Sequence, residues 1–109
     1  MVYLIKQECR KGTMFKVGYC GNLKKRLPQY MTHNATVQVV DTIQTYRKTK
    51  HKLESEIHNE IKEKGFDFIV NYGIKTEWFF VPMEQEQEFE RLGLSQFKAC
   101  KNRVVKRES

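Results

Sequence analysis

Two strand-like segments lie close together near the N-terminus, and they constrain the fold more than any other feature of the chain. Residues 2–7 and 14–19 are both rich in β-branched and aromatic side chains, which favour extended structure. Residues 10–13 (Arg-Lys-Gly-Thr) supply a turn sequence between them, and residues 20–21 (Cys-Gly) end the second segment. We therefore predict an antiparallel hairpin, against which the rest of the chain must pack.

A short basic helix is predicted after the hairpin. Asn22 is typical of a helix N-cap, and apolar residues recur after it at helical spacing, at Leu23, Leu27 and Tyr30 or Met31. Pro28 lies inside this segment, where it removes one backbone hydrogen bond and should kink or shorten the helix.

A third strand and a longer helix follow. Residues 36–46 alternate in hydrophobicity, which predicts a half-buried strand with three apolar residues on one face: Val37, Val39 and Ile43. Residues 49–64 carry an apolar stripe at helical spacing, formed by Leu53, Ile57 and Ile61. Gly65 stands where a left-handed residue commonly ends a helix.

The remainder of the chain is less regular. Residues 66–76 are expected to form an irregular connection, and the apolar run 77–81, which Pro82 ends, a short strand or packed segment. A further helix is expected over about 84–92, because glutamates crowd its first turns, where the helix dipole favours negative charge. The basic segment 98–107 is either a last helix or a loose tail.

Composition narrows the classes of function. The 109 residues fit one domain, and 20 Lys and Arg against 13 Asp and Glu give a net charge of +7, which favours a polyanionic partner such as nucleic acid. The three cysteines form no Cys-x-x-Cys pair, which argues against a disulfide framework and a structural zinc site. No leader pattern or membrane-spanning apolar run is present. We therefore expect a globular intracellular protein, in the cytoplasm or nucleus of a host cell, with no membrane partner.

Four polar side chains are predicted to converge beside the hairpin. A loop at residues 8–11 would place Tyr3 opposite Lys16, so that a phenol and an ammonium share one face of the sheet. The next helix would project Arg26 and Tyr30, four positions apart, from one side.

These residues, in this order and spacing, resemble the GIY-YIG nuclease superfamily. Tyr3 lies in Val-Tyr-Leu, residues 16–18 are Lys-Val-Gly, and Arg26 follows within Asn-Leu-Lys-Lys-Arg-Leu. Residues 53–58 (Leu-Glu-Ser-Glu-Ile-His) and 77–79 (Glu-Trp-Phe) resemble the Glu-x-x-Leu-His helix and the Glu-aromatic-Phe close of a branch common in phage and other viral proteins.

The chain departs from the family pattern at two points. Met1-Val2 stands where the family name implies Gly-Ile, and Lys16 replaces the tyrosine of the second motif. The Lys-Val-Gly form of that motif is itself a feature of the phage and viral branch. The resemblance covers about residues 2–82.

By this resemblance the fold is α+β, with a central three-stranded antiparallel sheet flanked by helices. Residues 1–82 would form the nuclease core, and residues 83–109 a C-terminal helix and basic tail packed on the core or extending it. The implied activity is endonucleolytic hydrolysis of phosphodiester bonds in DNA with Mg²⁺ or Mn²⁺, and RNA is the alternative nucleic acid. Target specificity and oligomeric state stay open.

The resemblance also implies roles for single residues. Glu54 would hold the ion, because Mg²⁺ prefers oxygen ligands and one carboxylate with a substrate oxygen and waters suffices. Arg26 would neutralise charge that develops on the phosphoryl oxygens. Tyr3 or Lys16 would help to deprotonate the attacking water, and Tyr30 would bond a phosphate or that water.

Glu54 is preferred over Glu56 as the metal ligand. Glu54 adjoins the apolar stripe and shares a helix face with His58, whereas Glu56 is expected to face solvent. His58 is assigned to nucleic-acid binding, with a packed structural histidine as the alternative, and Glu77 is expected to be a supporting carboxylate. Cations of the short helix and the tail are expected to hold the phosphate backbone: Lys24, Lys25, Lys101, Arg103, Lys106 and Arg107.

Two other functions stay open. One is a catalytically inactive nucleic-acid-binding module of the same fold, which the variant first motif permits. The other is a basic interaction protein that only imitates the pattern. Salt-dependent binding without cleavage would favour the first, and absence of nucleic-acid affinity the second.

Overall fold

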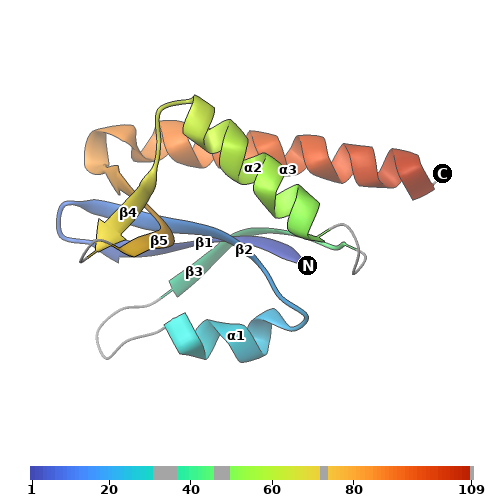
Figure 1. Ribbon diagram of the computed structural model, residues 1–109, viewed down its shortest axis with the longest axis horizontal. Coiled ribbons are helices and arrows are strands. Elements are labelled where there is room, and N and C mark those ends of the chain that lie inside the picture. Colours follow the sequence, from blue (N-terminus) through green and yellow to red (C-terminus); the bar gives the residue numbers. More distant parts are fainter. Residues whose placement is uncertain (31–36, 46–49, 72–73, 109) are drawn as a thin grey trace.

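An antiparallel sheet with helices on both faces organises the chain (Figure 1). A computed structural model describes residues 1–30, 37–45, 50–71 and 74–108, with side chains described at all of these except 70–71, 74–76 and 103–108. Over these residues the sheet has five strands in the order β3-β1-β2-β5-β4, namely β1 (Val2–Cys9), β2 (Gly12–Tyr19), β3 (Val37–Ile43), β4 (Phe68–Asn71) and β5 (Ile74–Pro82). The expected α+β class is confirmed, but the sheet has five strands where three were expected.

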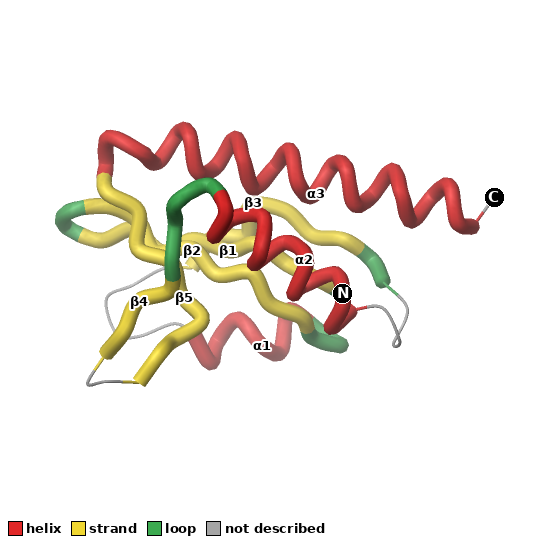
Figure 2. Tube along the Cα trace, turned by 45° about the horizontal axis from the view of Figure 1, so that its top comes forward, coloured by secondary structure: helices red, strands yellow, loops and turns green. Residues whose placement is uncertain are grey.

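The helices divide between the two faces of the sheet. Helix α1 (Leu23–Tyr30) lies against one face, and α2 (Lys50–Glu63) and α3 (Glu86–Glu108) lie against the other (Figures 1 and 2). A short 3-10 helix, η1 (Met83–Gln85), joins β5 to α3. Among the described residues, no helix combines the length and the apolar character needed to cross a bilayer.

The larger core lies between the sheet and the α2–α3 layer, and aromatic rings fill its centre. Phe15 and Phe89 have ring centroids 4.4 Å apart, and Phe68 and Phe79 have theirs 4.5 Å apart. Phe89 and Phe97, both fully buried, come from α3. Truncating either ring to alanine should cost about 3–5 kcal/mol of stability, so α3 is an integral part of this core.

A smaller core lies under α1. Alternate residues of β1 point to opposite faces, so that Val2 and Leu4 enter the larger core while Tyr3 and Ile5 enter the smaller one. Leu23, Cys20 and Val37 complete the buried part of this second cluster. Tyr3 therefore belongs to the α1 face of the sheet.

The N-terminal hairpin has a tighter turn than predicted. Cys9 pairs with Gly12, which leaves a two-residue turn, a common hairpin connection, in place of the expected loop at residues 8–11. Tyr3 consequently pairs with Gly18, so the predicted pairing of Tyr3 with Lys16 is wrong by two positions. A two-residue shift leaves every side chain on its face, and Tyr3 and Lys16 still share the α1 face.

An irregularity in β3 corrects a second expectation. Leu4 pairs with Asp41 while Ile5 pairs with Val39, so one extra residue of β3 is inserted between them as a bulge. The bulge reverses the alternation along β3. Val37 packs in the smaller core and Ile43 in the larger one, so the prediction that they share a face is wrong.

The end of α2 matches the sequence prediction. Gly65 has a φ of 97°, a left-handed conformation that glycine adopts without a Cβ clash. Its amide donates to the Lys62 carbonyl at 3.0 Å, and the Phe66 amide donates to the Ile61 carbonyl at 3.4 Å. This pair of bonds is the Schellman arrangement, which satisfies carbonyls at the helix end.

The C-terminal part is more regular than predicted. The connection expected at residues 66–76 contains β4, which forms a hairpin with β5, and the expected helix over 84–92 continues through the basic segment as α3. Polar contacts join α3 to three strands: Lys101 Nζ lies 2.6 Å from Asp41 Oδ1 on β3, Lys6 Nζ on β1 lies 3.3 Å from Glu90 Oε1, and Thr13 on β2 donates to Glu86.

Candidate active site

The candidate site lies where β2 and β5 separate. Their pairing ends at Lys16 opposite Trp78, and within the described strands β2 has no partner on this side from Val17 onward. Helix α2 lies beside this opening, where His58 Nε2 is 2.7 Å from the Val17 carbonyl oxygen. Because a carbonyl only accepts, Nε2 must carry a proton and donate it.

Two tyrosines and a lysine meet on the α1 side of the opening. The hydroxyl oxygens of Tyr3 and Tyr30 are 2.6 Å apart, so one donates to the other across β1 and α1. Trp78 meets the Tyr30 ring edge-on with centroids 5.8 Å apart. Lys16 Nζ lies 5.5 Å from the Tyr30 centroid and 5.8 Å from that of Trp78, within the range of cation–π attraction.

Lys16 is a nearly buried cation with one acidic partner. Only 8% of the residue is exposed, and Nζ donates to Glu77 Oε2 at 3.1 Å. Glu77 itself is exposed. The ammonium is therefore paired at one end of the opening, with two aromatic rings beside it.

Glu54 supplies a buried carboxylate from α2. It is 8% exposed, and Oε1 lies 3.7 Å from His58 Nδ1. In the described part of the chain, Oε2 is buried without a hydrogen-bond partner. Burial raises the pKa of Glu54 to about 7, the charge of Glu77 adds to the rise, and Lys16 opposes it. A buried oxygen without a hydrogen-bond partner is rare in folded proteins and calls for an explanation, such as a bound ion.

Burial also shifts two neighbouring groups. It raises the pKa of Tyr3 well above the usual value, the hydrogen bond with Tyr30 adds to the rise, and nearby Arg26 opposes it. Burial lowers the pKa of His58, while the bond to Val17 acts the other way. The neutral phenol of Tyr3 and the neutral imidazole of His58 are thus favoured, which opposes the expected use of Tyr3 as a phenolate base.

Helix α1 presents its cations to solvent. The N-cap prediction is confirmed, since the Lys25 amide donates to Asn22 Oδ1 at 3.4 Å, and the helix continues past Pro28. Lys24, Lys25 and Arg26 are exposed. Arg26 Nη1 donates to Gln29 Oε1 at 3.2 Å, and its charge reaches Tyr3, where it acts to lower the pKa of that phenol.

Of the remaining predicted binding residues, His58 lies beside the opening but is packed, and the other four belong to α3. His58 is buried, with its ring packed edge-on against Phe68 and Phe79, as in the alternative of a packed histidine. Lys101 is paired with Asp41 on β3. The other three tail cations belong to α3, but their side chains lie outside the described part: Arg103, Lys106 and Arg107.

The acidic side chains fit only a sparse metal site. Among the residues that the structure describes, no three His, Cys, Asp or Glu side chains gather as ligands. Mg²⁺ needs no such cage, because it keeps several waters and binds through one or two carboxylates plus substrate phosphate. The unpartnered Oε2 of Glu54, with the Glu77 carboxylate near enough to raise its pKa, suits an ion of this kind.

A family model, that of the T5orf172 domain, matches residues 1–105. The chain belongs to the T5orf172 domain family. This domain is phage-associated and nuclease-related, which agrees with the broader part of the resemblance inferred from the sequence. The match runs past the strands into α3. No curated protein and no solved structure matched the sequence.

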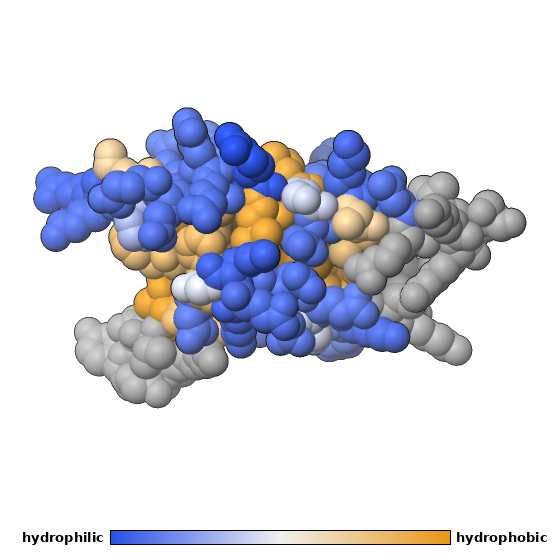
Figure 3. Space-filling model, turned by 90° about the horizontal axis from the view of Figure 1, so that it is seen from above, coloured by the Kyte–Doolittle hydropathy of each residue, from blue (hydrophilic) through white to orange (hydrophobic). Residues whose placement is uncertain are grey.

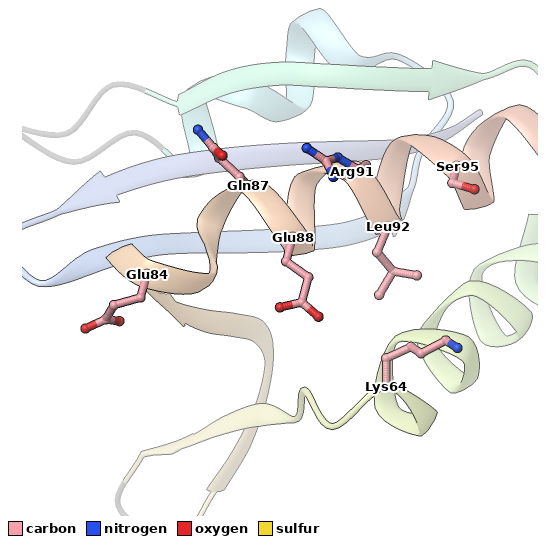
Figure 4. Close-up of a pocket in the computed structure, with 7 residues that line it drawn as sticks. All are labelled: Lys64, Glu84, Gln87, Glu88, Arg91, Leu92 and Ser95. Atoms are coloured by element: carbon pink, nitrogen blue, oxygen red, sulfur yellow. The ribbon is translucent and has the colours of Figure 1, made fainter.

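A hollow of about 610 Å³ in this T5orf172 domain lies between α3 and the end of α2 (Figure 4), whereas Tyr3 packs in the smaller core on the α1 face of the sheet. Glu88 and Leu92 point into it from α3, and Lys64, the residue that follows α2, borders it (Figure 4). The surface of this helical layer is largely hydrophilic, with apolar residues visible in its middle (Figure 3). The hollow contains none of the predicted catalytic residues.

Sequence reasoning missed two features of the T5orf172 site. It did not foresee that the Val17 carbonyl holds His58, because the free edge of β2 depends on where β5 stops pairing. It named Glu77 only as a supporting carboxylate and did not pair it with Lys16. Glu56, expected on a solvent side, is half-buried and borders a groove between α2 and α3.

Proposed function

We propose that the protein is a metal-dependent endonuclease of the GIY-YIG type that hydrolyses phosphodiester bonds in DNA. The observation that carries the proposal is the buried carboxylate of Glu54, whose Oε2 has no hydrogen-bond partner in the described part of the chain. A buried carboxylate with a pKa raised to about 7 costs stability, and such groups are concentrated at functional sites. Membership of a nuclease-related family supports the same conclusion.

Each residue of the site has a task in this proposal. Glu54 would hold Mg²⁺ or Mn²⁺, and the bound ion would supply positive charge that polarises the phosphodiester. Arg26, exposed on α1, would neutralise charge that develops on the phosphoryl oxygens. Lys16, paired with Glu77, would keep a fixed positive charge beside the phosphate.

The tyrosine pair would position the attacking water. Tyr3 is 1% exposed and its phenol is held neutral, so it is better suited to orienting Tyr30 than to removing a proton. Tyr30 is half-buried on α1, with its hydroxyl fixed by Tyr3 at 2.6 Å. We assign to Tyr30 the direct hydrogen bond to the water or to a phosphate oxygen. His58, held by its bond to the Val17 carbonyl, would pack beside Glu54, with Nδ1 3.7 Å from Oε1.

Cleavage of supercoiled plasmid, with and without Mg²⁺ or Mn²⁺, tests the proposal. Glu54→Gln keeps the shape of the side chain and removes its charge, so the variant should fold and bind DNA while ion-dependent cleavage falls about 100-fold or more. Glu63→Gln is the matched control, since Glu63 lies on the same helix and is exposed. Cleavage by Glu54→Gln at the wild-type rate would remove Glu54 from the mechanism.

One observation favours the binding-only function. The burial of Tyr3 and the rise in its pKa count against Tyr3 as the base that deprotonates the attacking water. If the wild-type protein cleaves no plasmid with either ion but binds DNA with salt dependence, the inactive binding module takes the place of the nuclease.

A further inference from the structure

Aromatic and sulfur-bearing side chains continue from the candidate site along the α1 face of the sheet. Met14 pairs with Phe80 across β2 and β5, and the next pair on the same face is Lys16 with Trp78. Met14 and Trp78 are half-buried, and Phe80 is 41% exposed. We call these three residues, Met14, Trp78 and Phe80, the open strip.

The open strip is partly exposed at the surface. Side chains of neighbouring strands stand about 5 Å apart on one face, so the Met14–Phe80 pair and Trp78 of the next pair form a continuous apolar surface with Lys16 beside it. The Phe80 ring extends over Gly12, where a Cβ would lie 3.1 Å from its Cζ. The buried part of the smaller core ends before Met14 and Phe80, which belong to neither buried cluster.

Positive charge borders the strip at both ends. The exposed cations of α1 lie toward the candidate site, and Arg10 and Lys11 are exposed in the β1–β2 turn at the other end. Lys16, between them, lies against the Trp78 ring. An apolar surface framed by cations suits a polyanion with flat apolar parts, which describes a nucleic-acid strand.

We propose that the open strip is a stacking platform for unpaired nucleotides, so that the domain acts on DNA with a single-stranded segment next to the phosphate that is cleaved. The proposal rests on the nuclease function and names its class of substrate. Bases inside a duplex are covered on both faces by their neighbours, so a ring on the protein surface can stack only on a base that has left the duplex. The cations would hold the phosphates on either side of that base.

The only tryptophan of the chain provides a direct probe, since it belongs to the strip. A short thymidine oligonucleotide, alone or annealed to its complement, would be titrated into the full protein while Trp78 fluorescence is recorded. The single strand should quench Trp78 and the duplex should not. Phe80→Ala should weaken single-strand binding about 10-fold, leave duplex binding within about twofold, and leave the salt slope unchanged, because the substitution removes base stacking and leaves every phosphate-binding cation in place.

Leu94→Ala is the matched control. Leu94 is also an apolar residue with 41% exposure, but it lies on α3, across the sheet from the strip. This variant should bind both oligonucleotides as the wild type does. Phe80→Leu removes the aromatic ring and keeps an apolar side chain, so it carries the test if Phe80→Ala does not fold.

The outcomes separate this proposal from the nuclease function. An unresponsive Trp78, or equal effects of the Phe80 variants on single strand and duplex, would overturn the platform even if plasmid is cleaved. Selective loss of single-strand binding in the Phe80 variants would support the platform even if the wild type cleaves nothing and the nuclease function fails.

Discussion

The phenol ring of Tyr3 lies across Gly18, its partner on the adjacent strand. A Cβ built at position 18 would lie 2.5 Å from the Tyr3 hydroxyl oxygen and 2.7 Å from Cζ. Real Cβ atoms are essentially never this close to a neighbour, so the ring can occupy this place only because residue 18 has no side chain. The glycine of the Lys-Val-Gly motif therefore provides the space that brings the Tyr3 hydroxyl to Tyr30.

Gly18→Ala should displace Tyr3 and break its bond to Tyr30. Overpacking of this kind typically costs about 1–3 kcal/mol, and cleavage should fall with the loss of the tyrosine pair. Gly21→Ala is the control, because a Cβ there meets nothing within 4 Å. Urea unfolding and plasmid cleavage of both variants would measure the difference, and equal behaviour of the two would contradict the packing argument.

Glu54→Gln should stabilise the metal-free protein at alkaline pH. The folded-state pKa of Glu54, about 7, lies above the ordinary value of 4.5, so the folded state binds more protons between these values and wild-type stability falls as pH rises through this window. The variant lacks this decrease and should be more stable by about 1–3 kcal/mol at pH near 8. The two proteins should converge near pH 4.

Urea unfolding across this pH range, with a chelator present, measures the effect. Parallel stability curves for Glu54→Gln and the wild type would show that Glu54 ionises as freely when folded as when unfolded. The proposed metal ligand would then lack its structural basis.

Lys16→Met should separate catalysis from folding. Methionine keeps apolar packing against Tyr30 and Trp78, and the exposed Glu77 loses only a partner that water can replace, so stability should change by less than about 1 kcal/mol. Cleavage should fall about 100-fold, because a fixed charge beside the phosphate is removed. Lys6→Met, which removes a strand lysine paired with Glu90 on α3, should leave cleavage unchanged.

The exposed cations of α1 should govern the salt dependence of DNA binding. Replacing Lys24 and Lys25 by alanine should lower the slope of log affinity against log salt by about one unit for each phosphate that is no longer neutralised. Lys101→Ala should instead reduce stability, by less than about 1 kcal/mol, since Lys101 is paired with Asp41. A slope that falls with Lys101→Ala but not with the α1 variant would reverse this assignment.

The sequence predicts on which face of the sheet a site residue lies better than it predicts the residue opposite it on the next strand. Tyr3 and Lys16 share a face because a register shift of two residues preserves the alternation of side chains. The wrong loop length therefore left the prediction of a shared face correct. Helical spacing likewise predicted the stripe of α2 and the end of that helix at Gly65. Patterns of period two or 3.6 are local, and local patterns survive small errors of register.

Features that depend on contacts with residues far away in the sequence were not predictable from local patterns. The bulge in β3 is determined by how that strand meets Leu4 and Ile5, and it moved Ile43 to the other core. The strand β4 is four residues long and is recognisable only once β5 pairs with it. The Val17 carbonyl acts as an anchor only because β5 stops pairing at Trp78.

The links between α3 and three strands have a consequence for how the chain folds. Lys6 and Glu90, which join β1 to α3, are separated by 84 positions in the sequence, and the rings of Phe89 and Phe97 that complete the larger core follow every strand. Pairing between such distant positions slows folding, because long loops must close before any stabilisation is gained. As the chain leaves the ribosome, its strands therefore emerge before the helix that covers them, and their exposed edges are open to aggregation or proteolysis until α3 docks.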